Sequence, residues 1–308
     1  MPPQSSISDL PAAAFLALRE AFFDAQGNPR VFELRDKRNT QDDPFDEYVH
    51  TLFSERLAAG IACQKASGPL ITPDLAILRP EICDGATRTS LATKLSGIVG
   101  LEVKKLERTV GGAVARASGL DYNTTPPCGT VRVYDRDNRP LDIRGFYLFV
   151  CQEPVPERPR HYQLSALTLC DGNLLNSDFE YYLSIVGSRK KKLGIGSYGD
   201  GADRARPMLI FVNPLGVSQL DHNVTLVHSR GDLATELPHL RHVGTIARTI
   251  PQESAGRSST AVFHCYRRQS NIPQAHTPFE LLDPFPVPSR TEATQARGRF
   301  RLDIQPSD

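Results

Sequence analysis

The alternation of apolar and polar residues predicts a strand in the first half of the chain. Between 98 and 105, Leu101 and Val103 alternate with Glu102 and Lys104. A period of two places the apolar pair toward a core, with the carboxylate and the ammonium side by side on the opposite face. A carboxylate and an ammonium that point the same way from a strand, like those of Glu102 and Lys104, need a partner or a chemical role.

Other stretches with the same alternation, or with continuous apolar character, predict further strands. The stretch 72–78 begins Thr-Pro-Asp and continues with four apolar residues, which places Asp74 at a strand entrance. The run 145–152 is apolar at nearly every position, as expected for a central strand covered on both faces. The remaining predicted strands are 130–134, 162–170, 208–213, 223–228 and 261–266.

Apolar residues at helical spacing predict the helices. The first spans 12–24 and begins after Ser8 or Asp9 and Pro11, residue types that are typical of helix N-termini. The second spans 42–62 and directs Phe45 and Val49 inward. Further helices are predicted at 85–97, at 173–186 and, interrupted at Pro238, at 233–246.

Helices and strands in this order predict an α/β fold with a central mixed β-sheet flanked by helices. At 308 residues the chain can form a single elaborated domain, 1–308, with its core at about 40–215. The chain is rich in proline beyond 271, so we expect a C-terminal extension, 271–308, packed on the body or on a second subunit. Three arginines there are available for phosphates: Arg297, Arg299 and Arg301.

Composition narrows the class of protein only slightly. Lysine and arginine number 36 against 35 acids, so any affinity for a polyanion must come from local patches. The six cysteines show no Cys-x-x-Cys pair, which argues against a zinc site and favours reduced thiols. No apolar run approaches the roughly 18 residues that a membrane span needs, and the amino terminus lacks a signal-peptide pattern, so we expect a soluble, cytoplasmic protein.

The acids and the lysine on the two predicted strands form the strongest candidate site. Two carboxylates, Asp74 and Glu102, hold Mg²⁺ while leaving room for water and phosphate in its coordination shell. Lys104 beside them faces the phosphate, where it stabilises transition-state charge or orients the attacking water. The alternative is a solvated strand edge with a surface ion pair worth under about 1 kcal/mol.

The order Pro73-Asp74, then Glu102-x-Lys104, resembles the signature of the PD-(D/E)XK nuclease superfamily, above all its type II restriction endonucleases. The resemblance implies that Asp74, Glu102 and Lys104 are catalytic, with Asp74 and Glu102 as Mg²⁺ ligands. In such nucleases an upstream helix often adds a carboxylate. Asp46 and Glu47 are the candidates in this chain, with Glu47 taken as the third ligand.

The resemblance also implies a function and partners. We expect a sequence-specific endonuclease that cuts double-stranded DNA at a GC-rich, near-palindromic target, acts as a homodimer and has a cognate DNA methyltransferase as its functional companion. In the branch with CCGG-core targets, to which PfoI-like enzymes belong, an Arg-x-(Asp/Glu)-Arg reader begins four residues beyond the catalytic lysine. Arg108 has this offset, but Val110 and Gly111 occupy the positions of the acid and the second arginine. A non-specific repair or mobile-element nuclease, and an inactive DNA-binding protein, remain alternatives.

Two further regions carry candidate DNA contacts. The first follows the Glu-x-Lys strand, where Arg, Asn and Asp can read base edges unless the segment is a structural loop. The second, 187–207, combines consecutive cations with glycines that allow close approach to a phosphate backbone, although it could equally be a solvated charge run; its glycine spacing is not that of a nucleotide P-loop. The candidates are Arg108, Arg116, Asp121 and Asn123 in the first region, and Arg189, Lys190, Lys191, Lys192, Asp203, Arg204 and Arg206 in the second.

Overall fold

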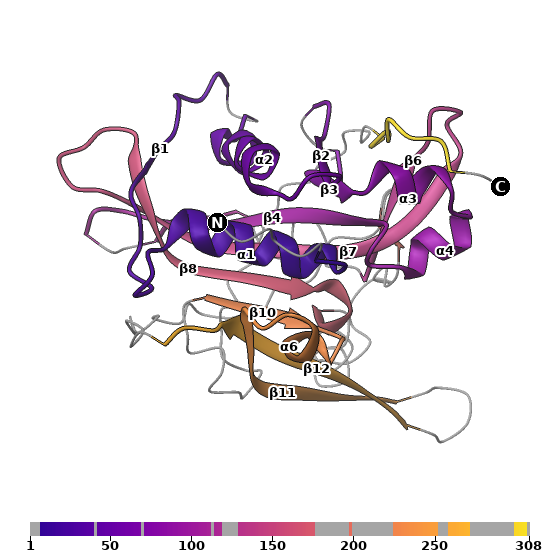
Figure 1. Cartoon of the computed structure of the whole chain (residues 1–308). Coiled ribbons are helices and arrows are strands. Elements are labelled where there is room, and N and C mark those ends of the chain that lie inside the picture. The colour runs from indigo at the N-terminus through magenta and orange to yellow at the C-terminus, as the bar shows by residue number, and fades with distance from the viewer. Residues whose placement is uncertain are drawn as a thin grey trace.

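A computed structural model describes residues 7–39, 42–68, 71–111, 114–118, 129–175, 197–198, 224–251, 258–271 and 299–306. The chain is α/β, with one large mixed and mostly antiparallel sheet flanked by a few helices (Figure 1). In spatial order the main strands are β2 (Ala62–Lys65), β3 (Leu75–Leu78), β4 (Ile98–Arg108), β7 (Pro140–Pro154), β8 (His161–Asp171), β10 (Val224–His228), β12 (Ser258–Arg268) and β11 (Leu240–Pro251). Four shorter strands pair beside this path: β1 (Phe32–Glu33) with β8, β5 (Val114–Ser118) with β4, β6 (Thr130–Tyr134) with β7, and β9 (Ser197–Tyr198) with β6.

Strand β7 lies at the centre of the sheet and is buried on both faces, as its continuous apolar sequence predicts. Phe146 and Leu148 pack into the core under the N-terminal helices, whereas Tyr147 and Phe149 pack into a second core on the opposite face. β4 pairs with β7 in parallel, so its Glu102 is aligned with Tyr147 at the middle of the sheet. The candidate site therefore rests on the buried middle of the sheet.

Helices α1 (Leu10–Phe22) and α2 (Pro44–Arg56) cover the first of these faces. Each begins at an aspartate N-cap followed by an early proline: the Asp9 carboxylate accepts from Ala12 N at 3.0 Å, and that of Asp43 accepts from Phe45 N at 3.0 Å. This satisfies backbone donors that the first helical turn cannot pair internally. Of the two residues at which the first helix was expected to begin, Ser8 and Asp9, the structure uses Asp9 as the N-cap, and the helix spans Leu10–Phe22 rather than 12–24.

Two of the predicted helices are shorter in the structure than in the sequence-based expectation. The helix expected to reach 62 ends at Arg56, and Gly60, with a positive φ of 83°, makes the turn that leads into β2. The helix expected over 85–97 is only α4 (Arg88–Thr93), and it is preceded by α3 (Pro80–Asp84). In each case a turn near glycine replaces the helical ends that the apolar spacing suggested.

The prediction of a helix over 233–246 is wrong. Only α6 (Leu233–Glu236) is helical, and the segment beyond Pro238 is the long strand β11. β11 pairs with β12 along its whole length, interrupted by one irregularity between His242 and Gly244. The backbone pairing of β11 with β12 outweighs the helical spacing of Leu233, Leu237 and Leu240.

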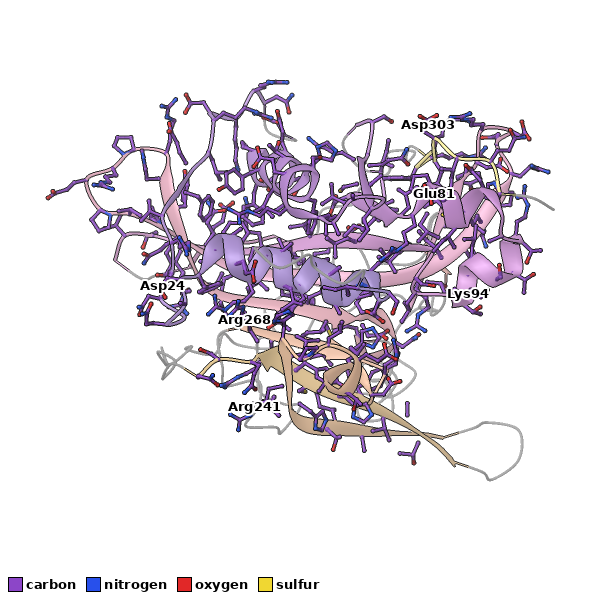
Figure 2. All side chains as sticks on the ribbon, in the orientation of Figure 1. Asp24, Glu81, Lys94, Arg241, Arg268 and Asp303 are labelled. Carbon is purple, nitrogen blue, oxygen red and sulfur yellow. The ribbon has the colours of Figure 1, made fainter. Side chains whose placement is uncertain are left out.

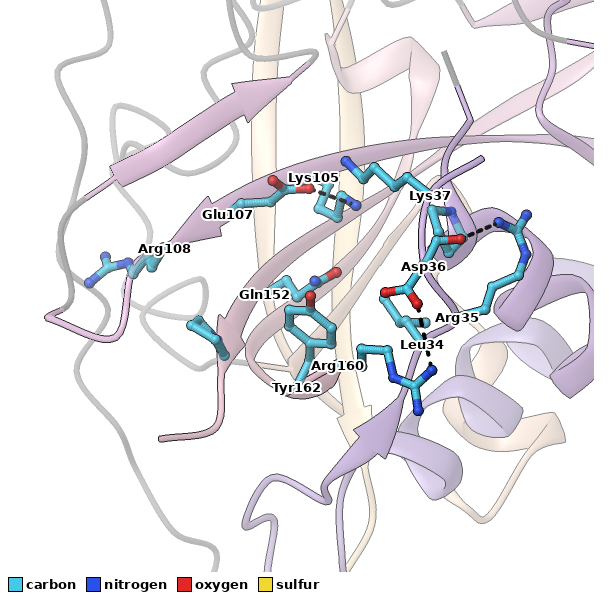
Figure 3. A pocket seen from close by; sticks show the side chains of 12 residues that line it. Leu34, Arg35, Asp36, Lys37, Lys105, Glu107, Arg108, Gln152, Arg160 and Tyr162 are labelled. Carbon is cyan, nitrogen blue, oxygen red and sulfur yellow. Dashed lines mark hydrogen bonds and ion pairs between the residues drawn. The ribbon is translucent and has the colours of Figure 1, made fainter. Parts of the chain in front are cut away.

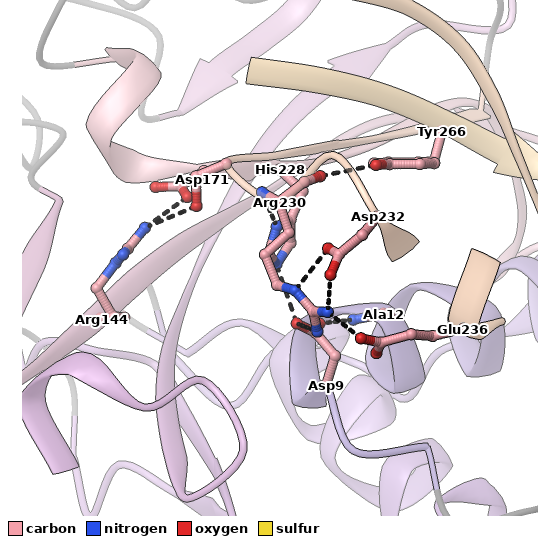
Figure 4. A network of polar contacts seen from close by, with 10 residues as sticks. Asp9, Ala12, Arg144, Asp171, His228, Arg230, Asp232, Glu236 and Tyr266 are labelled. Carbon is pink, nitrogen blue, oxygen red and sulfur yellow. Dashed lines mark hydrogen bonds and ion pairs between the residues drawn. The ribbon is translucent and has the colours of Figure 1, made fainter. Parts of the chain in front are cut away.

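A network of polar contacts connects the start of α1 to β10 and β12 (Figure 4). Asp9 Oδ2 lies 3.4 Å from His228 Nε2 at the end of β10 and 3.6 Å from Arg230. His228 Nδ1 accepts from Arg230 N at 2.9 Å, and the Tyr266 hydroxyl donates to Arg230 O at 2.7 Å. The helix cap thus also positions the turn that leads into α6.

The described part of the C-terminal extension packs on the body, as expected. Phe300 and Leu302 are buried beside β3 and β6, and their backbone exchanges hydrogen bonds of 2.7 Å with Tyr134. The Arg299 guanidinium lies 4.7 Å from the centre of the Tyr134 ring, so it makes a cation–π contact there. Arg297 lies outside the described residues.

The cysteines and the lengths of the helices bear on two further expectations from the sequence. The cysteines Cys63, Cys83, Cys151, Cys170 and Cys265 are free thiols, all but Cys63 buried, while Cys128 falls outside the described residues. None of the helices in the described segments is long and apolar enough to cross a membrane.

Candidate metal and phosphate site

The β3–β4 hairpin brings the Pro-Asp and Glu-x-Lys motifs together. Leu75 is aligned with Leu101 in this antiparallel pair, so Asp74, one position before β3, comes beside Glu102. The Asp74 carboxylate accepts a hydrogen bond of 2.7 Å from Val103 N. This bond holds the aspartate against β4.

Gly100 on β4, which has no side chain, allows this close approach. A Cβ on Gly100 would lie 2.4 Å from Val131 Cγ2 and 3.1 Å from Pro73 Cγ. Pro73 therefore packs directly over the Gly100 backbone, with β6 beside it. Glycine at this position sets the distance of Asp74 from β4.

Glu102 and Lys104 point to the same face of β4, as their spacing predicts, and both are buried. Their side chains form an ion pair of 2.7 Å between Lys104 Nζ and Glu102 Oε1, and the two residues are 6% and 3% exposed. Glu102 Oε2 is also buried but has no hydrogen-bond partner. A buried acceptor left unsatisfied costs about 1–3 kcal/mol, so the site is incomplete as it stands.

Asp46 on α2 is the next carboxylate of the group. Burial and the neighbouring Asp43 raise the pKa of Asp46 to about 7; Glu102 adds to the rise, and Lys105 opposes it. Burial, then Glu102 and Asp46, raise the pKa of Asp74 well above its ordinary value, against the smaller effects of Lys104 and Val103 N. Asp46, Asp74 and Glu102 thus concentrate more negative charge than Lys104 neutralises.

Glu47 points elsewhere. Its carboxylate pairs with Arg35, which donates from Nε at 2.9 Å and holds the pKa of Glu47 below its usual range. Of the two helix acids considered from the sequence, the structure brings Asp46 to Asp74 and Glu102, and it commits Glu47 to a surface ion pair.

Lys105, which the sequence analysis overlooked, fixes the start of α2 to β4. Its ammonium pairs with Asp43 at 2.9 Å and with Glu107 at 2.8 Å, and lies 5.7 Å from the centre of the Phe45 ring. Burial lowers the pKa of Lys105, but Asp43 and Glu107 more than offset this and raise it overall. The alternation that places Leu101 and Val103 inward also places Lys105 inward, and that signal could have identified it.

The donor chemistry of the site suits Mg²⁺, which prefers carboxylate oxygens. Within the segments that the structure describes, no three His, Cys, Asp or Glu side chains stand as a ready set of metal ligands. Asp46, Asp74 and Glu102 nevertheless repel one another electrostatically, and buried Glu102 Oε2 lacks a partner. A divalent cation would compensate the charge that now raises the pKa values of Asp46 and Asp74.

A pocket of about 420 Å³ lies near the end of β4 (Figure 3). Lys105 and Arg108 line it together with Arg35 and Arg160. Arg35 is paired with Asp42 and Glu47, Lys105 with Asp43 and Glu107, and Arg160 with Glu33 at 2.7 Å. The charge here is largely balanced, unlike that around Lys104.

The structure places only two of the candidate DNA-binding residues. Arg108 is the last residue of β4 and lines the pocket, and Arg116 is aligned with Glu107 on β5. Within 187–207, only the two residues of β9 are described. The other candidates lie outside the described residues: Asp121, Asn123, Arg189, Lys190, Lys191, Lys192, Asp203, Arg204 and Arg206.

Comparison with known proteins returns no match for this chain among protein-family models, curated proteins or solved structures.

Proposed function

We propose that this protein is a Mg²⁺-dependent endonuclease that hydrolyses phosphodiester bonds in double-stranded DNA, of the type II restriction kind. The observation that carries the proposal is the buried group on the β3–β4 hairpin, in which Asp74 and Glu102 lie beside Lys104. The Pro-Asp and Glu-x-Lys motifs of a nuclease signature thus share one face of adjacent strands.

The charge balance favours chemistry over a structural ion pair. A buried pair that serves only the fold is matched, because an uncompensated buried charge costs several kcal/mol (about 3–5). Here Asp74 and Glu102 interact with one lysine, Lys104, Asp46 adds a third carboxylate, and one oxygen of Glu102 has no partner. When Asp46 and Asp74 are ionised the group carries excess negative charge, and a bound cation would balance it.

Each residue then has a distinct role. Asp74 and Glu102, with Asp46 beside them, would hold Mg²⁺, which supplies Lewis-acid activation of the phosphate and its attacking water. Lys104 keeps a fixed ammonium next to the carboxylates, where it neutralises charge that develops on the phosphate oxygens. Pro73 on Gly100 and Val103 N on Asp74 keep the groups in place, so little reorganisation is needed during the reaction.

The proposal extends to the assembly and target. Cutting both strands of a near-palindromic site requires two copies of the site related by a two-fold axis, so a homodimer across the DNA is the simplest assembly. The restriction-enzyme resemblance supports a GC-rich target and a cognate methyltransferase as companion. Sedimentation with a single-site duplex should show two chains per duplex, and one chain at saturating protein would contradict the dimer.

Digestion of a plasmid library tests the function directly. With Mg²⁺ or Mn²⁺ we expect discrete bands that disappear on target methylation, and no cleavage with Ca²⁺ or a chelator. A metal-dependent smear instead favours the non-specific repair or mobile-element nuclease. Intact plasmid under every metal condition, with DNA binding retained, favours the inactive DNA-binding protein.

A further inference from the structure

Two arginines lie directly opposite one another at the outer end of the sheet. Arg241 on β11 is aligned with Arg267 on β12 in an antiparallel ladder. Residues opposite each other in such a ladder share a face, with Cβ atoms about 4.5–5.5 Å apart. Arg241 is exposed and projects outward from the hairpin in Figure 2, and Arg267 is half-buried.

This pair is unfavourable for the folded protein alone. Like charges directly opposite on neighbouring strands destabilise a sheet, and burial together with Arg241 lowers the pKa of Arg267. In the described part of the chain no acid forms an ion pair with either arginine. The next residue shows the contrast, because Arg268 is paired with Glu20 at 3.1 Å.

The pair also lies on the same face of the sheet as Lys104. Phe263 and Cys265 of β12 belong to the core that contains Leu106 of β4, and strand alternation places Arg267 on that face as well. The strand registers define one row of aligned positions: Lys104 is aligned with Phe149, Phe149 with Thr168, and Thr168 with Thr225. Because Leu226 is aligned with Tyr266 in an antiparallel pair, Thr225 lies opposite Arg267. Arg267 is in turn aligned with Arg241. Four strand spacings of about 4.8 Å separate Lys104 from Arg267, or roughly 19 Å.

We propose that Arg241 and Arg267 bind a backbone phosphate of the same DNA duplex whose scissile phosphate faces Lys104. This inference rests on the proposed nuclease function. A guanidinium donates two parallel hydrogen bonds to phosphate oxygens, and an anion between the two arginines removes their mutual repulsion. At about 3.4 Å per base pair, roughly 19 Å corresponds to a contact about six base pairs from the cut. Between these ends the row consists of Phe149, Thr168 and Thr225, which are uncharged and buried, so the charged side chains of the row stand only at its two ends.

Salt-dependent binding of a duplex tests this inference. The test variant is R241Q/R267Q, and the matched control is R56Q/R158Q, which removes two exposed arginines elsewhere. Binding is measured by fluorescence anisotropy with a GC-rich duplex in a chelator, so that no cleavage occurs. We expect R241Q/R267Q to weaken binding roughly tenfold near 0.1 M salt and to reduce the log–log salt slope by about 0.9, the value for one lost phosphate contact.

The remaining variants separate charge from folding. R241K/R267K should keep most of the salt slope, because it keeps both charges. The melting temperature of R241Q/R267Q should equal or exceed that of the wild type, because repulsion is removed. Equal slopes for R241Q/R267Q and R56Q/R158Q would overturn the inference, and so would inorganic phosphate binding at the pair without any effect on duplex affinity. Failure of the nuclease proposal is a separate result, namely an intact plasmid with wild-type protein and Mg²⁺.

Discussion

Two groups of charged residues at the start of α2 show opposite electrostatics. Around Arg35, the acids Asp42 and Glu47 each have a lowered pKa, because the guanidinium donates hydrogen bonds to both. Around Glu102, the acids Asp46 and Asp74 each have a raised pKa, because burial and like charge outweigh Lys104 and Lys105. The first group is balanced within the chain while its acids are ionised, whereas the second needs either bound protons or a cation to balance its acids.

Lys104 and Lys105, which point to opposite faces of β4, show the same difference between balanced and unbalanced charge. Lys105 is held by two acids and ties α2 to the sheet, so it acts on the fold. Lys104 has one partner, Glu102, whose second oxygen is unsatisfied. Charge that is balanced internally therefore marks structure in this protein, and unbalanced charge marks the candidate site.

The largest effect should come from removing Lys104 or the charge of Asp74. Lys104→Ala and Asp74→Asn should each lower the cleavage rate by at least about 10²–10³-fold, the usual effect of losing one transition-state stabiliser. Duplex binding should change little, because these groups act mainly on the transition state. Glu47→Gln is the control and should cleave at nearly the wild-type rate. Cleavage by both test variants within tenfold of wild type would move the active site elsewhere.

Gly100→Ala should show how strictly the Pro73–Asp74 turn is held. The added methyl group meets Val131 and Pro73, so we expect a stability loss of about 1–3 kcal/mol and slower cleavage. Gly111→Ala is the matched control, because its Cβ would meet only Thr109 Oγ1 at 3.8 Å. Chemical denaturation of both variants measures the effect, and equal stabilities would show that the turn has room to adjust.

Asp46 and Glu47 are adjacent acids that should have different effects on cleavage. Asp46→Asn should slow cleavage about tenfold, or about 1.4 kcal/mol, because it removes a carboxylate beside Asp74 and Glu102. Glu47→Gln breaks only the contact with Arg35 and should cost under about 1 kcal/mol of stability. Single-turnover rates of the two variants on one substrate decide the point; a reversed order would assign the third carboxylate to Glu47.

The smallest expected effect is a pH-dependent stability difference in a chelator. With its pKa raised to about 7, Asp46 is protonated in the folded protein at pH values where the unfolded chain is still ionised. The folded state therefore binds the extra proton, and wild-type stability should rise as pH falls from 8 toward 4. Asp46→Asn should be more stable than wild type at pH 8, because its amide does not ionise, with the difference shrinking toward pH 4. A constant difference across this range would show that Asp46 titrates normally.

The sequence predicted the parts of this picture that depend on local pattern. Alternation placed Glu102 and Lys104 together on one face, continuous apolar character identified the central strand β7, and Asp9 marked the start of α1. These features need only the spacing of residues within one element.

The features that sequence reasoning missed depend on contacts between distant segments. The choice between Asp46 and Glu47 follows from Arg35, which removes Glu47 from the site. Strand β11 replaces the helix expected at 233–246 because it pairs with β12. The opposed pair Arg241 and Arg267 likewise emerges only from the register of that hairpin, since neither position is unusual in the sequence alone.

Titration calorimetry with Mn²⁺ tests the central claim most directly, because it needs no knowledge of the DNA target. The wild-type protein should bind Mn²⁺, Asp74→Asn and Glu102→Gln should lose that binding, and Glu47→Gln should retain it. Binding of Mn²⁺ by Asp74→Asn and Glu102→Gln with wild-type affinity, or no binding by the wild type at millimolar Mn²⁺, would contradict the account.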